Sequence, residues 1–91
     1  MNDKDLSILI VDDLQFSRIV VKSALKKAGY TGVRMAESAH EALKMLEEQP
    51  ADVVLADWMM PEMNGLELTD RIRQNDEEKG IYTSIILFTA N

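Results

Sequence analysis

The chain has 91 residues, a net charge of −6 and no cysteine, and 46% of its residues are hydrophobic. These values fit one small globular domain and exclude a disulfide framework or a thiolate metal site. The acidic balance argues against nucleic acid or an anionic membrane as a direct partner. No apolar run could span a bilayer, and the N-terminal residues do not resemble a secretion signal, so we expect a cytoplasmic protein.

The first third of the chain alternates between strand and helix patterns. An apolar run over residues 6–11 predicts a buried strand that stops at Asp12 and Asp13. Residues 15–28 then place apolar side chains at helical spacing, and residues 32–36 predict a short strand at the sheet edge. The apolar positions of this helix are Phe16, Ile19, Val20, Ala24, Leu25 and Ala28.

A second helix is predicted from its capping residues. Ser38 followed by Glu41 three positions later forms a capping box, and Pro50 ends the helix because the residue before a proline avoids helical angles. Its expected buried side chains are Ala39, Ala42, Leu43 and Leu46. Residues 51–57 are again apolar and predict a strand that ends at a single carboxylate, Asp57.

The last third predicts a helix over residues 65–74, a charged loop over 75–80 and a strand over 83–89. In the helix we expect burial of Leu66, of Leu68 or Thr69, and of Ile72. The final strand is apolar throughout, which is typical of a strand covered on both faces.

The order of these elements, strand and helix in alternation with short connections, predicts an α/β fold with a doubly wound parallel sheet. The carboxyl ends of parallel strands share one rim, where such sheets bind their ligands. We therefore expect Asp12, Asp13, Asp57 and Thr89 to form one polar cluster.

Three crowded carboxylates would raise at least one pKa unless a cation joined them. Mg²⁺ prefers oxygen ligands, and the carbonyl of Met59 is a further candidate ligand. With the metal bound, Asp57 could attack a phosphoryl group to give an aspartyl phosphate, and Thr89 could hydrogen-bond to the product.

Each residue alone has a simpler interpretation. Asp12 and Asp13 could be a helix N-cap pair, Asp57 a turn residue, and Thr89 carries little information by itself. Only their joint placement at strand ends favours a site. His40 is expected on a solvated face.

Met60 and Met63, together with Met59, are expected to pack the loop after Asp57, and Trp58 is expected to be exposed beside that carboxylate. A phosphohydrolase with an Asp nucleophile would need a second Asp at the position of Met59. A nucleotide-binding domain is disfavoured because no glycine-rich turn follows the first strand.

Three segments resemble the receiver domains of two-component response regulators of the CheY-like type. They are Ile8–Asp13, Asp57–Gly65 and Phe88–Ala90. The middle segment is highly specific, and the resemblance extends over the whole chain.

The resemblance implies that Asp57 is the phosphoacceptor and that a histidine kinase supplies its phosphoryl group. It also implies that Asp12 and Asp13 form the acidic Mg²⁺ pocket. Asp57 and the Met59 carbonyl would complete the metal ligands, and Thr89 would be the switch hydroxyl. Arg18 and Met59 would border the site, and the position of Met59 is the one at which the family tunes dephosphorylation. Such a domain is a phosphoacceptor rather than an enzyme in the usual sense.

Relative to this family, residues 1–91 lack the last helix, strand and helix, and with them a lysine that pairs with the phosphoryl group. We therefore expect a truncated receiver domain. The alternative function is a phosphorylation-impaired scaffold that associates with itself through the exposed fourth strand, residues 83–89.

Overall fold

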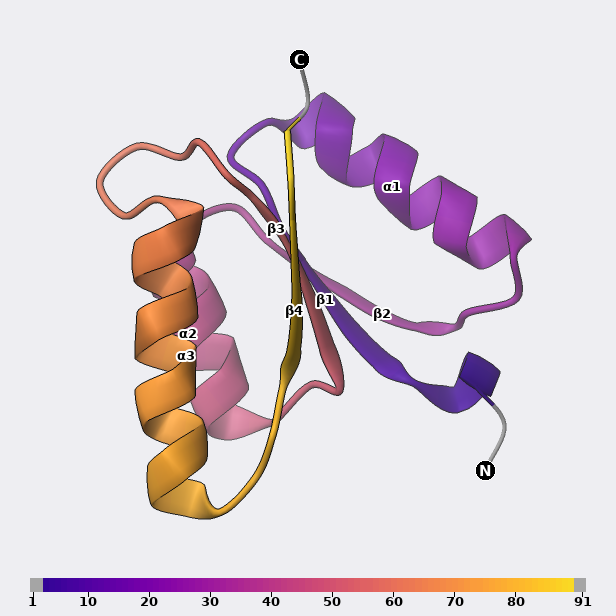
Figure 1. Ribbon diagram of the computed structural model, residues 1–91. Helices are drawn as coiled ribbons and strands as arrows, with labels where there is room; N and C mark the ends of the chain where they lie inside the picture. The colour runs from indigo at the N-terminus through magenta and orange to yellow at the C-terminus, as the bar shows by residue number, and fades with distance from the viewer. Residues whose placement is uncertain (1–2, 90–91) are drawn as a thin grey trace.

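The structure is a computed structural model that describes residues 3–89 (Figure 1). Ala90, part of the last segment noted above, lies outside these residues. The elements in chain order are η1 (Asp3–Asp5), β1 (Ser7–Val11), α1 (Gln15–Lys27), β2 (Gly32–Ala36), α2 (Ala39–Glu48), β3 (Val53–Asp57), α3 (Gly65–Lys79) and β4 (Ser84–Phe88). Among the described residues, no helix is both long and apolar enough to cross a membrane.

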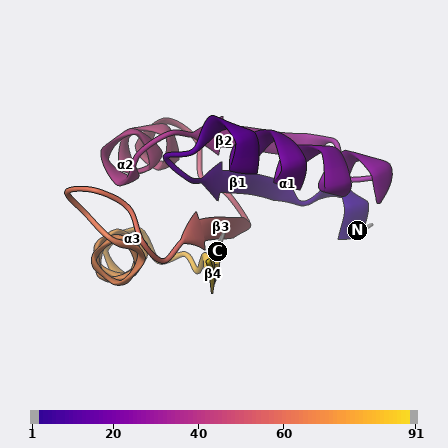
Figure 2. The same cartoon turned by 90° about the horizontal axis from the view of Figure 1, so that it is seen from above.

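The four strands form one parallel sheet in the order β2-β1-β3-β4. This confirms the predicted α/β fold of the CheY-like type, and it places β2 at an edge as expected. The helices cover the two faces unequally, with α1 on one side and α2 and α3 on the other (Figure 1). Seen from above, α2 and α3 lie side by side, and they contact each other directly (Figure 2).

The main core lies between the sheet and the pair α2 and α3. Side chains alternate between the two faces of a strand, so Leu9 and Val11 of β1 point into this core, while Ile8 and Ile10 point toward α1. The other buried members of the core are Ala36, Ala39, Ala42, Leu46, Ala51, Val54, Ala56, Met60, Met63, Leu68 and Ile72. This layer therefore holds β1 and β3, the two strands that end in carboxylates.

The predicted helix ends are mostly confirmed. The Ser38 side chain accepts a hydrogen bond from the Glu41 backbone N–H at 3.1 Å, as expected for the N-cap of α2. Lys26 and Lys27 lie in the last turn of α1, where positive charge is favourable, and Gly29 follows with φ 99°. Leu43 is only partly buried against the core rather than fully buried.

The prediction for α3 was wrong in its length. The helix continues to Lys79 through the charged residues expected to form a loop, and Gly80 ends it in the left-handed conformation with φ 67°. Its buried residues include Leu68 and Ile72 as expected, but Leu66 is 50% exposed. A buried acidic residue, Asp76, hydrogen-bonds from the last turns of the helix to Thr83.

The apolar stripe of α1 is not covered in the described structure, and β4 is not covered on both faces. No residue of α1 is buried, and Phe16 is 79% exposed. β4 lies at the edge of the sheet, and its Ile86 is 54% exposed. A surface pocket between α1 and β4 is lined by Phe16, Ser17, Val20, Val21, Phe88 and Thr89.

Candidate functional site

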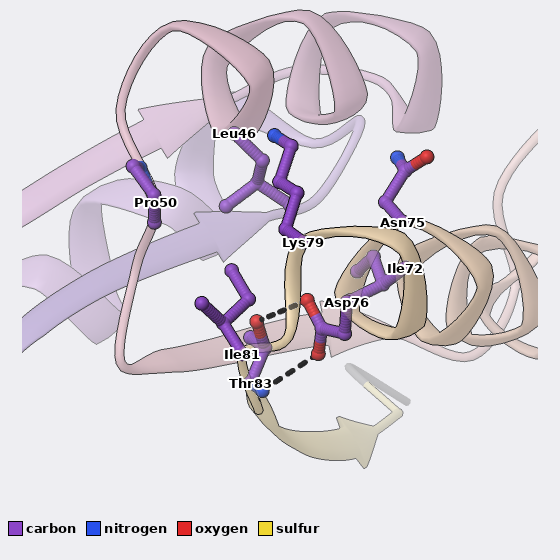
Figure 3. A pocket seen from close by; sticks show the side chains of 8 residues that line it. All are labelled: Leu46, Pro50, Ile72, Asn75, Asp76, Lys79, Ile81 and Thr83. Atoms are coloured by element: carbon purple, nitrogen blue, oxygen red, sulfur yellow. Dashed lines mark hydrogen bonds between the residues drawn. The ribbon is translucent and has the colours of Figure 1, made fainter.

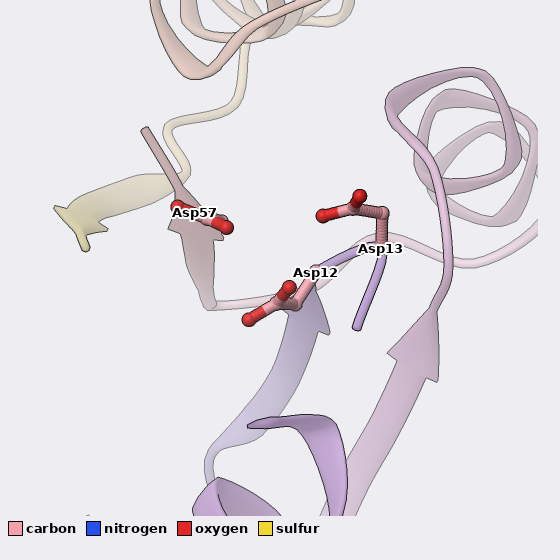
Figure 4. Close-up of side chains that lie close together, drawn as sticks. All are labelled: Asp12, Asp13 and Asp57. Carbon is pink, nitrogen blue, oxygen red and sulfur yellow. The ribbon is translucent and has the colours of Figure 1, made fainter. Parts of the chain in front are cut away.

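Three carboxylates meet where β1 and β3 end. Asp12 and Asp13 follow β1 directly, and Asp57 is the last residue of β3. The two strands are neighbours in register, with Val11 opposite Ala56, so the next residues of each lie side by side. One carboxylate oxygen from each of Asp12, Asp13 and Asp57 lies within 4.8 Å of the others (Figure 4). The predicted clustering of these three residues is therefore what the structure shows.

Asp12 is fully buried, which is unusual for a carboxylate. Its Oδ1 accepts a hydrogen bond from the Leu14 N–H at 2.9 Å, and its own N–H donates to the Ala36 carbonyl at 3.2 Å. Its Oδ2 has no hydrogen-bond partner among the described residues. A buried carboxylate oxygen without a partner is costly, so the geometry favours a ligand at this atom.

Asp57 is also buried and accepts a hydrogen bond from the Met59 N–H at 3.1 Å. Burial raises the pKa of Asp57 above its ordinary value, and the negative charges of Asp12 and Asp13 raise it further. The Met59 N–H opposes this shift because it stabilises the ionised carboxylate. The pKa rise expected from crowded carboxylates is thus present at Asp57.

The chemistry of the three residues fits a hard divalent cation. All the side-chain donors are carboxylate oxygens, and no nitrogen or sulfur ligand takes part in the group. Asp13 is exposed while Asp12 and Asp57 are buried, so an ion would reach the two buried oxygens from the solvent side. A cation would also balance the charges that raise the Asp57 pKa. These residues fit Mg²⁺, which keeps several waters when it binds to a few carboxylates.

Gly65 places the start of α3 against the end of β3. A Cβ atom at Gly65 would lie 3.0 Å from the Asp57 carbonyl oxygen and 2.9 Å from Leu87 Cδ2. The Gly65 N–H donates to the Trp58 carbonyl at 3.0 Å, and the Asn64 side chain accepts from the Glu67 N–H as the N-cap. The loop after the phosphoacceptor candidate is therefore closed tightly, and only glycine fits at its end.

The side chains of this loop divide into buried and exposed residues. Met60 and Met63 are buried in the core, as expected, whereas Met59 is 68% exposed and does not pack the loop. Trp58 is exposed beside Asp57, as predicted, and its backbone N–H donates to the Phe88 carbonyl at 2.7 Å. Met59 and Trp58 thus form the solvent side of the site.

Thr89 follows Phe88, the residue of β4 that pairs with Asp57 in the sheet. Its side chain is exposed and lines the pocket between α1 and β4. A role for its hydroxyl remains a prediction, as does a metal contact from the Met59 carbonyl. His40 is exposed, as expected, with its Nε2 3.8 Å from Glu62 Oε2.

Two features of the site were not predicted from the sequence. Asn64 is the N-cap of α3, which the pattern of Asn64 with Glu67 three residues later could have indicated. Arg18 was expected to border the site, but its partner was not foreseen. The Arg18 Nη1 donates to the Asp12 carbonyl at 2.7 Å, a contact that depends on the path of the loop.

Residues 8–91 match the response regulator receiver domain family, and the chain belongs to that family. It is a CheY-like receiver domain of the two-component systems. Among curated proteins it is 36% identical over 88 residues to chemotaxis protein CheY-3 of Vibrio cholerae, covering 97% of this chain and 66% of that protein. It is 38% identical over 86 residues to chemotaxis protein CheY1 of Helicobacter pylori, covering 93% of this chain and 68% of that protein.

Solved structures agree with the family. The receiver domain of the histidine kinase CKI1 from Arabidopsis thaliana, complexed with Mg²⁺ and BeF₃⁻, superposes with a TM-score of 0.85 at 35% identity. The match covers 94% of this chain and 66% of that one. CheY4 of Vibrio cholerae gives a TM-score of 0.81 at 32% identity over 91% of this chain and 67% of that one. The chain thus spans 66% of the length of Vibrio cholerae CheY-3 and 66% of the CKI1 receiver-domain chain.

Proposed function

We propose that the domain is a phosphorylation switch in which Asp57 accepts a phosphoryl group from a phosphohistidine of a histidine kinase. Asp12, Asp13 and Asp57, with the Met59 carbonyl, would hold the Mg²⁺ that this transfer requires. The observation that carries the proposal is the convergence of three carboxylates within 4.8 Å, one of them with a buried oxygen that has no hydrogen-bond partner in the described part of the chain. The CKI1 receiver domain complexed with Mg²⁺ and BeF₃⁻ supports the choice of metal.

The residues divide the work of the transfer between them. An Asp57 oxygen forms a bond to phosphorus while the phosphorus–nitrogen bond of the donor breaks, and the imidazole leaves with that electron pair. The Met59 N–H, which donates to Asp57 Oδ1 at 3.1 Å, holds the carboxylate in one orientation. Bound Mg²⁺ supplies positive charge for the phosphoryl oxygens. Thr89, at the end of the neighbouring strand, would hydrogen-bond to the product as the switch hydroxyl.

Phosphorylation replaces the single negative charge of the Asp57 carboxylate with an acyl phosphate of about −1.5 to −2 charges, on a rim that is already acidic, so it is a strong local perturbation. A change in the position of Thr89 or of the exposed loop at Trp58 would transmit the effect of phosphorylation to a partner. The chain is similar to chemotaxis proteins, which favours a chemotaxis-like output.

Labelling with a small phosphodonor tests the proposal. Incubation with phosphoramidate and Mg²⁺ should add one phosphoryl group, measured by intact-mass spectrometry, and peptide mapping should place it on Asp57. Asp57→Asn should abolish labelling, and Asp70→Asn, at an exposed aspartate of α3, is the matched control. Labelling that persists in Asp57→Asn would refute the assignment.

A second candidate function rests on the edge strand. Within residues 3–89 the outer edge of β4 pairs with no other strand, and its Ile86 is 54% exposed. Such an edge is a template for pairing with another chain. A polypeptide of residues 1–91 would then act as a self-associating interaction module. Light scattering coupled to size exclusion should show a dimer or larger species that Ile86→Lys converts to a monomer. Leu66→Lys, at an equally exposed apolar residue of α3, should leave it associated. A monomer at every concentration would reject this function.

A further inference from the structure

We infer that Arg18 is a positioning residue that holds the peptide between Asp12 and Asp13 for the divalent cation. The inference rests on the proposed Mg²⁺ site and adds a residue that supplies no metal ligand. Its basis is the Arg18 side chain itself, which lies on α1 and contacts both the end of β1 and the segment after β2.

The contacts of Arg18 are directed at the backbone that carries the acidic pair. Its Nη1 donates to the Asp12 carbonyl oxygen at 2.7 Å, and its Nη2 lies 3.8 Å from Glu37 Oε2. The side chain is only 13% exposed, although no residue of α1 is buried and Phe16, two positions earlier, is 79% exposed. The guanidinium therefore lies against the site rather than in solvent.

This contact matters because little else holds the loop. The N-cap residue of α1, Leu14, makes no side-chain capping bond, and α1 contributes no buried residue to anchor its start. The loop is fixed by the hydrogen bond from the Asp12 N–H to the Ala36 carbonyl, by the bond from the Leu14 N–H to Asp12 Oδ1, and by the bond from Arg18 to the Asp12 carbonyl. That carbonyl belongs to the peptide that joins Asp12 to Asp13, so fixing it orients both carboxylates.

Electrostatics and positioning make opposite predictions for Arg18. A positive charge near the carboxylates repels Mg²⁺, so on charge alone its removal should tighten metal binding. If the geometric role dominates, removal should weaken binding, because mutations of groups that orient metal ligands typically cost about 10–100-fold in affinity. Whether Mg²⁺ affinity rises or falls on removal of Arg18 therefore distinguishes the electrostatic effect from the positioning effect.

The experiment compares Arg18→Met with Lys22→Met, which removes the same charge from an exposed position one turn further along α1. Mg²⁺ affinity is measured by calorimetry. We expect Arg18→Met to bind Mg²⁺ about tenfold more weakly and Lys22→Met to bind it as tightly as the unmodified chain or slightly more so. Arg18→Lys, which keeps the charge but not the planar fork, should fall between them.

A second measurement, without metal, keeps the test independent of the proposed function. Amide hydrogen exchange at Asp12 and Leu14, whose N–H groups donate to the Ala36 carbonyl and to Asp12 Oδ1, should become faster in Arg18→Met, while exchange in β3 stays unchanged. Unaltered exchange at these two amides, or unaltered or tighter Mg²⁺ binding by a folded Arg18→Met, would overturn the inference. Failure of the unmodified chain to bind Mg²⁺, with faster exchange in the variant, would count against the proposed metal site and not against the positioning of the loop.

Discussion

The carboxylate of Asp76, on α3, accepts two hydrogen bonds from Thr83, the residue just before β4. Asp76 Oδ2 accepts from the Thr83 N–H at 2.7 Å, and Oδ1 accepts from the Thr83 hydroxyl at 3.0 Å (Figure 3). Both residues are buried. Arg73 completes the arrangement, since it pairs with Asp76, donates to the Thr83 carbonyl and stacks on Tyr82. The last turn of α3 is thereby tied to the strand that pairs with β3.

Removal of this carboxylate should destabilise the fold strongly. Asp76→Ala leaves the Thr83 N–H and hydroxyl buried without partners, so we expect a loss of about 2–4 kcal/mol in the free energy of unfolding. Urea unfolding followed by circular dichroism measures it. Glu77→Ala, at the exposed neighbouring position, is the control and should change stability by less than about 0.5 kcal/mol. Equal effects of the two substitutions would show that the Asp76 contacts contribute little.

The same residue explains why the length of α3 could not be predicted. Residues 75–80 are charged and lack an apolar stripe, so helical periodicity ends at Ile72 in the sequence. In the structure the helix continues because Asp76 finds partners at Thr83, a contact between residues seven apart that no local pattern contains. Helix propensity does not oppose this extension, since Glu77, Glu78 and Lys79 are good helix formers. The apolar stripe gives no sign of it because the buried position one turn after Ile72 is the acidic Asp76.

The site was more predictable than the helix ends. Asp12, Asp13 and Asp57 follow apolar runs directly, and parallel strands bring such residues to one rim, so their meeting follows from topology. Coverage of α1 and β4 could not be inferred from their apolar patterns, because these patterns indicate only that a side chain prefers burial. The contact of Arg18 with the Asp12 carbonyl depends on loop conformation, which sequence periodicity does not describe.

A methyl group at Gly65 should disturb the site through the backbone. In Gly65→Ala the new Cβ would crowd the Asp57 carbonyl oxygen at 3.0 Å, so the loop must move or α3 must shift. We expect a loss of about 1–3 kcal/mol in stability and weaker Mg²⁺ binding. Calorimetric and urea measurements on the same sample test both effects. Gly80→Ala, where a Cβ has open space but φ is 67°, is the comparison. It should reduce stability by about 1 kcal/mol and leave metal affinity unchanged.

Trp58 should report the binding of a cation to the neighbouring carboxylates. Its indole is partly exposed, and its backbone follows Asp57 directly, so a change of charge or loop position alters its surroundings. Titration with Mg²⁺ should change the fluorescence intensity or the emission maximum with a saturable dependence. Asp12→Asn should weaken the response, and Asp70→Asn should not. A flat titration at millimolar Mg²⁺ would mean that the three carboxylates do not bind the ion.

The raised pKa of Asp57 predicts how stability depends on pH without metal. Because burial raises the pKa of this carboxyl in the folded state, the folded chain binds more protons than the unfolded chain between the ordinary and the raised pKa. The contribution of Asp57 to the free energy of unfolding therefore falls as the pH rises through that window, and the loss persists at neutral pH. At a pH below the ordinary pKa, Asp57 is protonated in both the folded and the unfolded chain, and this contribution disappears.

Asp57→Asn should consequently be more stable than the unmodified chain at neutral pH without divalent metal, and the difference should shrink on acidification. The amide oxygen of the variant still accepts from the Met59 N–H, so the loop contact is kept. Added Mg²⁺ should reverse the order, because a ligand that binds the folded state stabilises it and the variant lacks one carboxylate. Urea titrations at several pH values, with and without Mg²⁺, measure both effects. A variant less stable than the unmodified chain in metal-free neutral buffer would show that repulsion and burial at Asp57 do not oppose folding.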